Sequence, residues 1–108
     1  MDNNPHFIAE LKYLKTEDGG RKTAAKSGYR PQVQFDFEKM STSGSQKFVD
    51  KEIVFPGESV LAEITLLSPQ FFEYKLKVGM QFNFHEGPII VGSGKILELK
   101  DEKLIAVI

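Results

Sequence analysis

The sequence predicts an all-β fold, and three features carry that prediction. Apolar and polar residues alternate with a period of two in several short segments, as expected for strands with one buried face. Turn signals rich in glycine, proline and serine separate those segments at short intervals. Almost no segment shows the periodicity of an amphipathic helix. These features favour a β-barrel or a β-sandwich, formed as one domain over residues 1–108.

The first part of the chain predicts two strands joined by a long polar loop. Residues 7–14 place apolar side chains at every second position, so one face of this strand should be buried. Residues 15–27 are mostly polar and contain a double glycine suited to a turn. Residues 32–38 show the clearest alternation in the chain. The positions of this strand expected to face the core are Val33, Phe35 and Phe37.

The rest of the barrel or sandwich is predicted from four further segments. Residues 41–45 are rich in serine and glycine and predict a turn or loop. A strand of mixed quality is expected over residues 46–53, and a clear one over 59–67. Residues 80–85 again alternate, with the aromatic side chains facing inward.

The C-terminal end predicts two more strands. The phrase Gly92-Ser93-Gly94 is typical of a β-bulge or a barrel corner, and a strand should continue over residues 95–99. Residues 100–103 are polar and separate this strand from the apolar run 104–108, which indicates a hairpin. The added strand could form a dimer seam or cover the barrel, and we favour the covering role.

Composition excludes several classes of protein. Of the 108 residues, 41% are hydrophobic and 27% charged, as in an ordinary globular domain, and there is no cysteine for disulfides or thiolate chemistry. The net charge of −1 gives no general attraction to nucleic acid. Between positions 12 and 30, however, there are six basic residues and only two acidic ones. This segment is either a solvated loop or a surface for phosphate or carboxylate groups. With no signal peptide and no membrane-spanning apolar run, we expect a cytoplasmic protein.

The sequence lacks the phosphate-binding loop of a GTPase. That loop requires the pattern G-x-x-x-x-G-K-[ST]. The nearest match is Gly94-Lys95, but Ile89 stands in place of the first glycine and Ile96 in place of the serine or threonine. We therefore expect neither binding nor hydrolysis of GTP.

The histidines do not predict a catalytic or metal site. His6 belongs to an N-terminal lead, residues 1–6, that should be frayed. His85 and Glu86 are neighbours on a predicted strand, so they should point to opposite faces, which is unsuitable for a base and its orienting carboxylate. No spacing of histidine, aspartate or glutamate suggests a metal cage. We therefore expect no cofactor and no enzyme activity.

Five fragments in fixed order resemble one known family. They are Asp18-Gly19-Gly20-Arg21, Gly28-Tyr29-Arg30-Pro31-Gln32, Phe55-Pro56-Gly57-Glu58, Phe84-His85-Glu86-Gly87 and Val91-Gly92-Ser93-Gly94. Their order and spacing are similar to those of the C-terminal, third domain of elongation factor Tu, over about residues 7–99. The resemblance implies a closed antiparallel six-stranded barrel, here with an extra C-terminal strand and without the factor's other two domains.

The resemblance also implies candidate RNA contacts. In that family the third domain supports the T stem of aminoacyl-tRNA, and Gln32, Ser41, Glu86 and Gly87 stand at or near contacting positions. His85 replaces a family arginine, and Pro88-Ile89-Ile90 replace a Gly-Arg-Thr phrase. Two cations and a hydroxyl are therefore lost from this face. Because phosphate contacts dominate nucleic-acid affinity, we expect tRNA binding to be weak.

A second candidate surface comes from the loops before the second long strand. Gly19, Gly20 and Arg21 resemble the family loop that faces the GTPase domain, and without that domain they could meet another protein. Arg30 belongs to the same kind of partner loop, although it could instead pair with a carboxylate across the loop.

These observations leave three hypotheses for function. The favoured one is a non-catalytic binding module that engages an unidentified protein partner, because Ile89 and Ile90 add apolar surface where cations are lost. Burial of this pair is the competing account, since only one of two adjacent strand residues can point inward. One alternative is a weak RNA-binding module that uses Gln32, Ser41, Glu86 and Gly87 together with the basic segment 12–30. The other is a fragment of a larger elongation factor.

Overall fold

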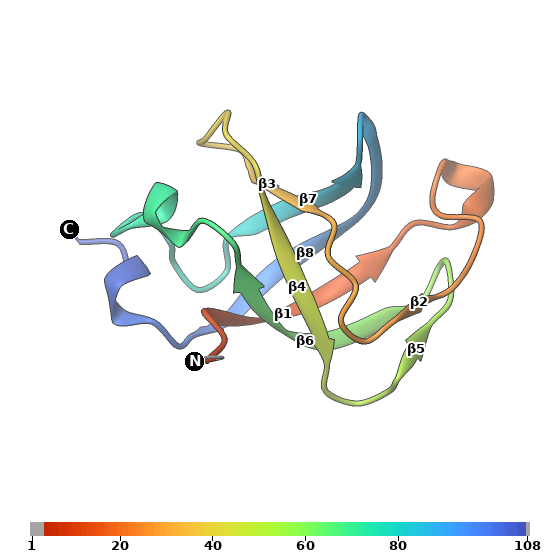
Figure 1. Ribbon diagram of the computed structural model, residues 1–108, viewed down its shortest axis with the longest axis horizontal. Coiled ribbons are helices and arrows are strands. Elements are labelled where there is room, and N and C mark those ends of the chain that lie inside the picture. Colours follow the sequence, from red (N-terminus) through yellow and green to blue (C-terminus); the bar gives the residue numbers. More distant parts are fainter. Residues whose placement is uncertain (1–3, 108) are drawn as a thin grey trace.

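The computed structural model describes residues 4–107, and within them six antiparallel strands form a closed barrel (Figure 1). The strands follow one another around the barrel in the order β1 (Phe7–Tyr13), β6 (Ser59–Leu66), β4 (Thr42–Phe48), β3 (Gln32–Phe35), β7 (Gln81–Glu86) and β8 (Ile89–Leu99). Pairing of β8 with β1 closes the ring. The predicted all-β class and closed six-stranded barrel are confirmed.

Short elements lie outside the ring of strands. A separate two-stranded sheet is formed by β2 (Ala25–Lys26) and β5 (Ile53–Val54). Three 3₁₀ turns are η1 (Thr16–Asp18), η2 (Pro69–Phe72) and η3 (Glu102–Leu104). Figure 1 shows η2 and η3 at one end of the barrel and η1 at the other.

The core is built from alternate residues of each strand. All four odd-numbered side chains of β1 are buried, and so are the even-numbered ones of β6, as their alternation predicts. Phe7 lies among the aromatic rings of the core, with its ring centroid 6.3 Å from that of Phe35 and 5.7 Å from that of Phe82. Edge contacts of this kind add to the stabilisation that comes from burying the rings.

Two glycines on β8 leave room for two of these rings. Gly92 lies opposite Phe84 and Gly94 opposite Phe82 in the register of β7 and β8. A Cβ atom on Gly92 would lie 2.1 Å from Cζ of Phe84, and one on Gly94 would lie 2.3 Å from Cζ of Phe82. The rings therefore occupy the space that side chains at these positions would need.

A β-bulge lies directly before these glycines. Phe84 pairs with Gly92 and the next residue of β7 pairs with Ile90, so Val91 is an extra residue on β8. The bulge predicted from Gly92-Ser93-Gly94 is thus present, centred just before that phrase.

The structure corrects the sequence prediction around β3 and β4. Strand β3 ends at Phe35, and Phe37 is 46% exposed instead of buried. The predicted turn at 41–45 is wrong, because β4 begins at Thr42 and is paired with both β3 and β6. Gly44 pairs with Leu66 in this strand, and a glycine is needed there because a Cβ would lie 2.6 Å from Cγ2 of Val33. Glycine and serine here allow close packing and do not form a loop.

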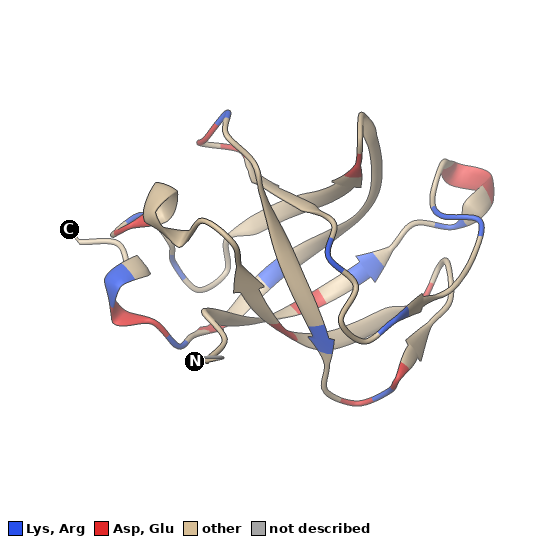
Figure 2. Ribbon diagram, in the orientation of Figure 1, with Lys and Arg blue, Asp and Glu red and all other residues tan. Residues whose placement is uncertain are grey.

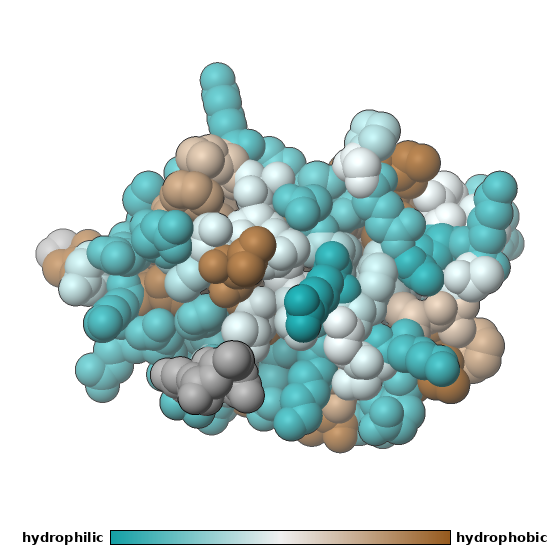
Figure 3. All heavy atoms as spheres, in the orientation of Figure 1, coloured by the Kyte–Doolittle hydropathy of each residue, from teal (hydrophilic) through white to brown (hydrophobic). Residues whose placement is uncertain are grey.

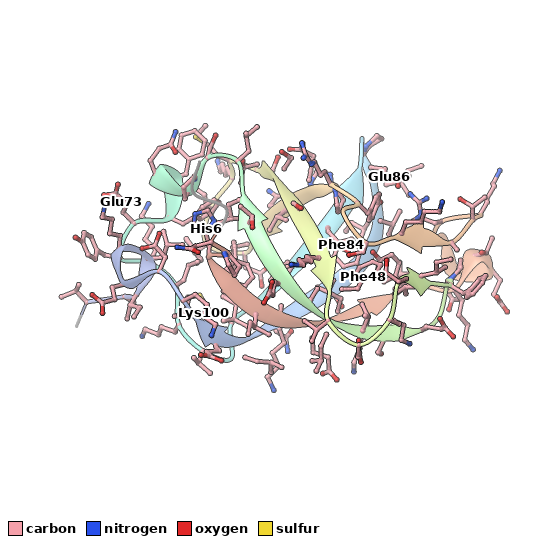
Figure 4. The ribbon with its side chains drawn as sticks, turned by 60° about the horizontal axis from the view of Figure 1, so that its bottom comes forward. His6, Phe48, Glu73, Phe84, Glu86 and Lys100 are labelled. Atoms are coloured by element: carbon pink, nitrogen blue, oxygen red, sulfur yellow. The ribbon has the colours of Figure 1, made fainter. Side chains whose placement is uncertain are left out.

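The described part of the N-terminal lead is anchored, which corrects the prediction of a frayed end; residues 1–3 lie outside the described residues. The amide of His6 donates to the carbonyl of Ile64 at 2.8 Å, and its Nδ1 accepts from the amide of Leu66 at 2.8 Å. The amide of Lys100 donates to the carbonyl of His6 at 2.9 Å, and the two residues lie at the same end of the barrel (Figure 4). His6 therefore links the end of β6 to the residue that follows β8.

The C-terminal extension adds an extended segment, as predicted, but with a different pairing partner. Leu76 and Ile105 form a parallel β-bridge, whereas the expected partner was residues 95–99. The amide of Leu76 donates to the carbonyl of Leu104 at 2.8 Å, and the amide of Ala106 donates to the carbonyl of Leu76 at 2.8 Å. The side chain of Leu104 is buried in the core. The extension therefore covers one end of the barrel, while Ile108 lies outside the described residues.

Candidate functional site

Three polar side chains from distant parts of the chain meet at the turn end of the β7–β8 hairpin. Glu86 ends β7, Arg21 follows η1, and Tyr29 lies in the loop before β3. Figure 4 shows Glu86 at the end of its strand, beyond Phe84, which is buried in the barrel. We call Arg21, Tyr29 and Glu86 the hairpin-end cluster.

The donors of this cluster converge on one carboxylate oxygen. Nη1 of Arg21 and the hydroxyl of Tyr29 both donate to Oε2 of Glu86. The guanidinium carbon of Arg21 lies 4.5 Å from the centroid of the Tyr29 ring, a cation–π contact. Further guanidinium donors reach the carbonyls of Thr23 and Ala24, each at 3.3 Å. Glu86 is therefore held by internal partners.

Buried groups beneath the cluster hold the Tyr29 loop against β4. The amide of Gln46 donates to the carbonyl of Tyr29 at 2.9 Å, and the amide of Gly28 donates to the carbonyl of Gln46 at 2.7 Å. The hydroxyl of Tyr13 donates to Oε1 of Gln46 inside the barrel. Nε2 of Gln46 is buried with no hydrogen-bond partner among the described residues. Sequence reasoning assigned Gln46 to a poorly defined strand and missed this role.

The two tyrosines should make the protein sensitive to high pH. Burial, and then the hydrogen bond to Glu86, raise the pKa of Tyr29 well above its usual 10; burial, and then the neighbouring Tyr29, raise that of Tyr13. The pKa of each tyrosine is therefore higher in the folded state than its unfolded value of about 10. The resulting stabilisation of the fold is complete below pH about 10 and is lost as the pH rises toward the folded-state pKa. We expect tyrosinate absorbance from these residues to appear together with loss of far-ultraviolet circular dichroism.

Tyr29→Phe tests this coupling, and the exposed Tyr74 supplies the control. The Tyr29→Phe variant should lose part of the absorbance change that accompanies unfolding, whereas Tyr74→Phe should leave that part unchanged. Complete ionisation of all tyrosines in a protein that retains its circular dichroism would contradict the expectation.

The predicted RNA-contact residues lie side by side on one face of the barrel. Gln32 on β3 is in register with His85 on β7 and with Ser43 on β4. The hydroxyl of Ser41 donates to Oε1 of Gln32 at 3.3 Å. Figure 2 shows no charged residue along the ribbon of β3 or along β7 before its end. Ser43 was missed in the sequence because its segment was expected to be a loop.

The structure brings His85 and Gly87 together as well. Nδ1 of His85 lies 2.7 Å from the carbonyl oxygen of Gly87, and since a carbonyl only accepts, Nδ1 carries the hydrogen. Nε2 of His85 is buried and has no hydrogen-bond partner among the described residues. Gly87 has a φ of +57° in the two-residue loop between Glu86 and Ile89, a conformation that favours glycine.

Both isoleucines after this loop face solvent. Ile89 is 56% exposed and Ile90 is 47% exposed, so neither of the two adjacent strand residues is buried. The bulge turns Val91 and Gly92 inward together, which leaves Ile90 facing outward. Ile89 pairs with Glu86 at the hairpin turn, beyond the last buried residue of β7. Figure 3 shows hydrophobic atoms where Figure 1 places this end of the hairpin. We call Ile89 and Ile90 the isoleucine pair.

The predicted partner loop is divided between two places. Arg21 belongs to the hairpin-end cluster, whereas Gly19 and Gly20 lie beside η1. A Cβ on Gly20 would lie 2.3 Å from the carbonyl oxygen of Leu14, so this glycine permits a close backbone approach. Arg30 forms no ion pair with a described carboxylate, so the pair suggested for it is corrected to Arg21 and Glu86.

Two other kinds of feature are absent from the part of the chain that the structure describes. None of its helical segments has the length and apolar character needed to cross a membrane. Within residues 4–107, no three histidine, aspartate or glutamate side chains are grouped as ligands for a metal ion.

One comparison with known protein families gave a match. The family model described as "Elongation factor Tu C-terminal domain" matches residues 1–100. The matched region contains every strand of the barrel, the hairpin-end cluster and the isoleucine pair. It ends before η3, so the segment that covers the end of the barrel lies outside the match.

Proposed function

The chain belongs to the elongation factor Tu C-terminal domain family, and on this premise we propose that it is a non-catalytic module that binds a protein partner through the end of its β7–β8 hairpin. The family makes it a translation-factor-like domain. The contact surface is formed by the isoleucine pair, with the hairpin-end cluster beside it.

The exposure of both isoleucines carries this proposal. Exposed apolar side chains that are grouped together are typical of protein interfaces, whose centres are depleted in charge. In this protein the nearest carboxylate, Glu86, is already paired with Arg21 and Tyr29. A partner could therefore cover Ile89 and Ile90 without leaving an unpaired charge buried at the edge of the contact.

RNA binding is the second candidate, supported by the uncharged row of Gln32, Ser41 and His85 on one face. Two features weaken it. Oε2 of Glu86 already accepts from Arg21 and Tyr29, so the carboxylate is partly neutralised before a nucleotide approaches. Pro88 offers no backbone donor at the hairpin turn, and strands β3 and β7 carry no cation to hold phosphates. Contact with tRNA is therefore expected to be weak and to decrease with salt.

Replacement of the isoleucine pair tests the protein-binding function. We expect Ile89→Ser/Ile90→Ser to reduce recovery of a specific protein by about tenfold or more in pull-downs from the source organism's lysate after RNase treatment. The matched control is Val49→Ser/Val78→Ser, because these residues are 57% and 62% exposed at other places on the surface. Thermal melts must show that both variants fold equally well.

The outcomes separate the two candidate functions. If the isoleucine variant and the valine control recover the same partner equally well, the isoleucine pair is not part of the interface. Loss of the bound material on RNase treatment, together with its loss in Gln32→Ala at low salt, would transfer the function to RNA.

A further inference from the structure

A polar hollow lies on the outer surface between β4 and β6, on strands that do not carry the isoleucine pair. It has a volume of about 420 Å³ and is lined by side chains from both strands and from the loop that enters β3. The residues that give it chemical character are Arg30, Ser43, Ser45, Lys47, Glu63 and Thr65. The volume is in the range of pockets that hold small molecules.

Three hydroxyl groups of the hollow have no hydrogen-bond partner within residues 4–107. Ser45 on β4 lies opposite Thr65 on β6, and Ser43 is two residues before Ser45 on the same face. All three residues are partly buried. None of these hydroxyls forms a hydrogen bond with another of the described residues, although their neighbours Ser41 and Thr42 do. They remain available to a ligand as both donors and acceptors.

The charges around the hydroxyls are also unpaired. Arg30 and Lys47 are exposed, and neither has a carboxylate within ion-pair distance among the described residues. Glu63 lies opposite Lys47 in the strand register without forming an ion pair. The backbone next to Arg30 is fixed, because the carbonyl of Pro31 accepts from the amide of Gly44 at 2.9 Å. Arg30 is therefore presented to the hollow by a held loop.

We propose that this hollow binds a small phosphorylated sugar or polyol. The guanidinium of Arg30 offers paired donors that match the oxygens of a phosphate group, and hydroxyls of Ser43, Ser45 and Thr65 complete its hydrogen bonds. Lys47 adds a second cation. The carboxylate of Glu63 accepts from a hydroxyl of the sugar, a role that an inorganic anion cannot satisfy. This site does not depend on the proposed function of the hairpin end.

The proposal is tested by titrating the full chain with ribose 5-phosphate and following backbone amide signals by NMR. We expect saturable shifts centred on Ser43, Ser45 and Thr65. Arg30→Gln should weaken binding by about tenfold or more. Lys95→Gln is the matched control, because it removes one exposed cation from β8, and its affinity should equal that of the unchanged protein.

Further ligands identify what is recognised. Ribose alone should not bind, and inorganic phosphate should bind more weakly than the sugar phosphate. Glu63→Gln should reduce the difference in affinity between the sugar phosphate and inorganic phosphate, because it removes the carboxylate that accepts from a sugar hydroxyl. A short single-stranded RNA is the last probe, since its phosphodiesters carry similar oxygens.

Three results would overturn the proposal. They are shifts spread over the whole surface without saturation, equal affinities of Arg30→Gln and Lys95→Gln, and tighter binding of the RNA than of ribose 5-phosphate at the same amides. The last result would assign the hollow to a nucleic-acid backbone instead of a small ligand.

Discussion

Gly92→Ala is expected to destabilise the barrel by roughly 3 kcal/mol, an effect typical of overpacking in a well-packed core. The added Cβ would lie 2.1 Å from Cζ of Phe84 and 2.6 Å from its Cε2. Phe84 is fully buried, and its ring centroid lies 5.0 Å from that of Tyr13, so it cannot move aside without displacing a second ring. The melting temperature should fall by more than about 10 °C in calorimetry.

The neighbouring residue and the opposing ring supply the controls. Ser93 lies between the two glycines on the opposite side of the strand, so Ser93→Ala should melt close to the unchanged protein. In the Gly92→Ala background, Phe84→Leu should recover part of the loss because a smaller side chain makes room for the methyl group. A Gly92→Ala protein as stable as Ser93→Ala would show that the ring does not need this space.

Most strands could be predicted from the sequence because buried and exposed residues alternate along them. In β1 and β6 every second residue is buried, so a period of two was sufficient to place both faces. The same rule failed for Phe37, where the apolar pattern continues but the strand ends at Phe35. It also failed for Thr42–Ser45, whose residues are typical of loops but are paired on both sides. Whether such a segment forms a strand depends on the strands that pair with it, and these cannot be identified from the residues of the segment alone.

The candidate site was less predictable because it depends on contacts between distant residues. Arg21 and Glu86 were both selected from the sequence, yet for different surfaces, and the structure joins them through a pair 65 residues apart. The outward position of Ile90 follows from a bulge whose exact place requires the register, and Ile89 is exposed because it pairs with Glu86 beyond the last buried residue of β7. The hydroxyls at Ser43, Ser45 and Thr65 gave no sequence signal, because they meet only when β4 pairs with β6.

The second large effect is expected at the C-terminal extension, where Leu104→Ala should cost roughly 2–5 kcal/mol, as in other truncations of buried leucines. Leu104 is buried in the same core cluster as Phe72 and Leu76, although it lies beyond the region that matches the family. Its removal would leave a cavity at this end of the barrel and weaken the pairing of residues 103–106 with the segment at Leu76.

Hydrogen exchange distinguishes a local from a global role for this segment. Since the amides of Leu76 and Ala106 both bond across the pairing, they should lose protection in Leu104→Ala, and the whole barrel should melt at a lower temperature. Val107→Ala is the control because Val107 is largely exposed two residues beyond the bridge at Ile105. If Leu104→Ala exposes only these amides while the strands keep their protection and melting temperature, the extension is a detachable cover. If the strands lose protection together with the extension and the melting temperature falls, the extension is part of the cooperative core. We expect this result because Leu104 packs with the buried residues of the barrel.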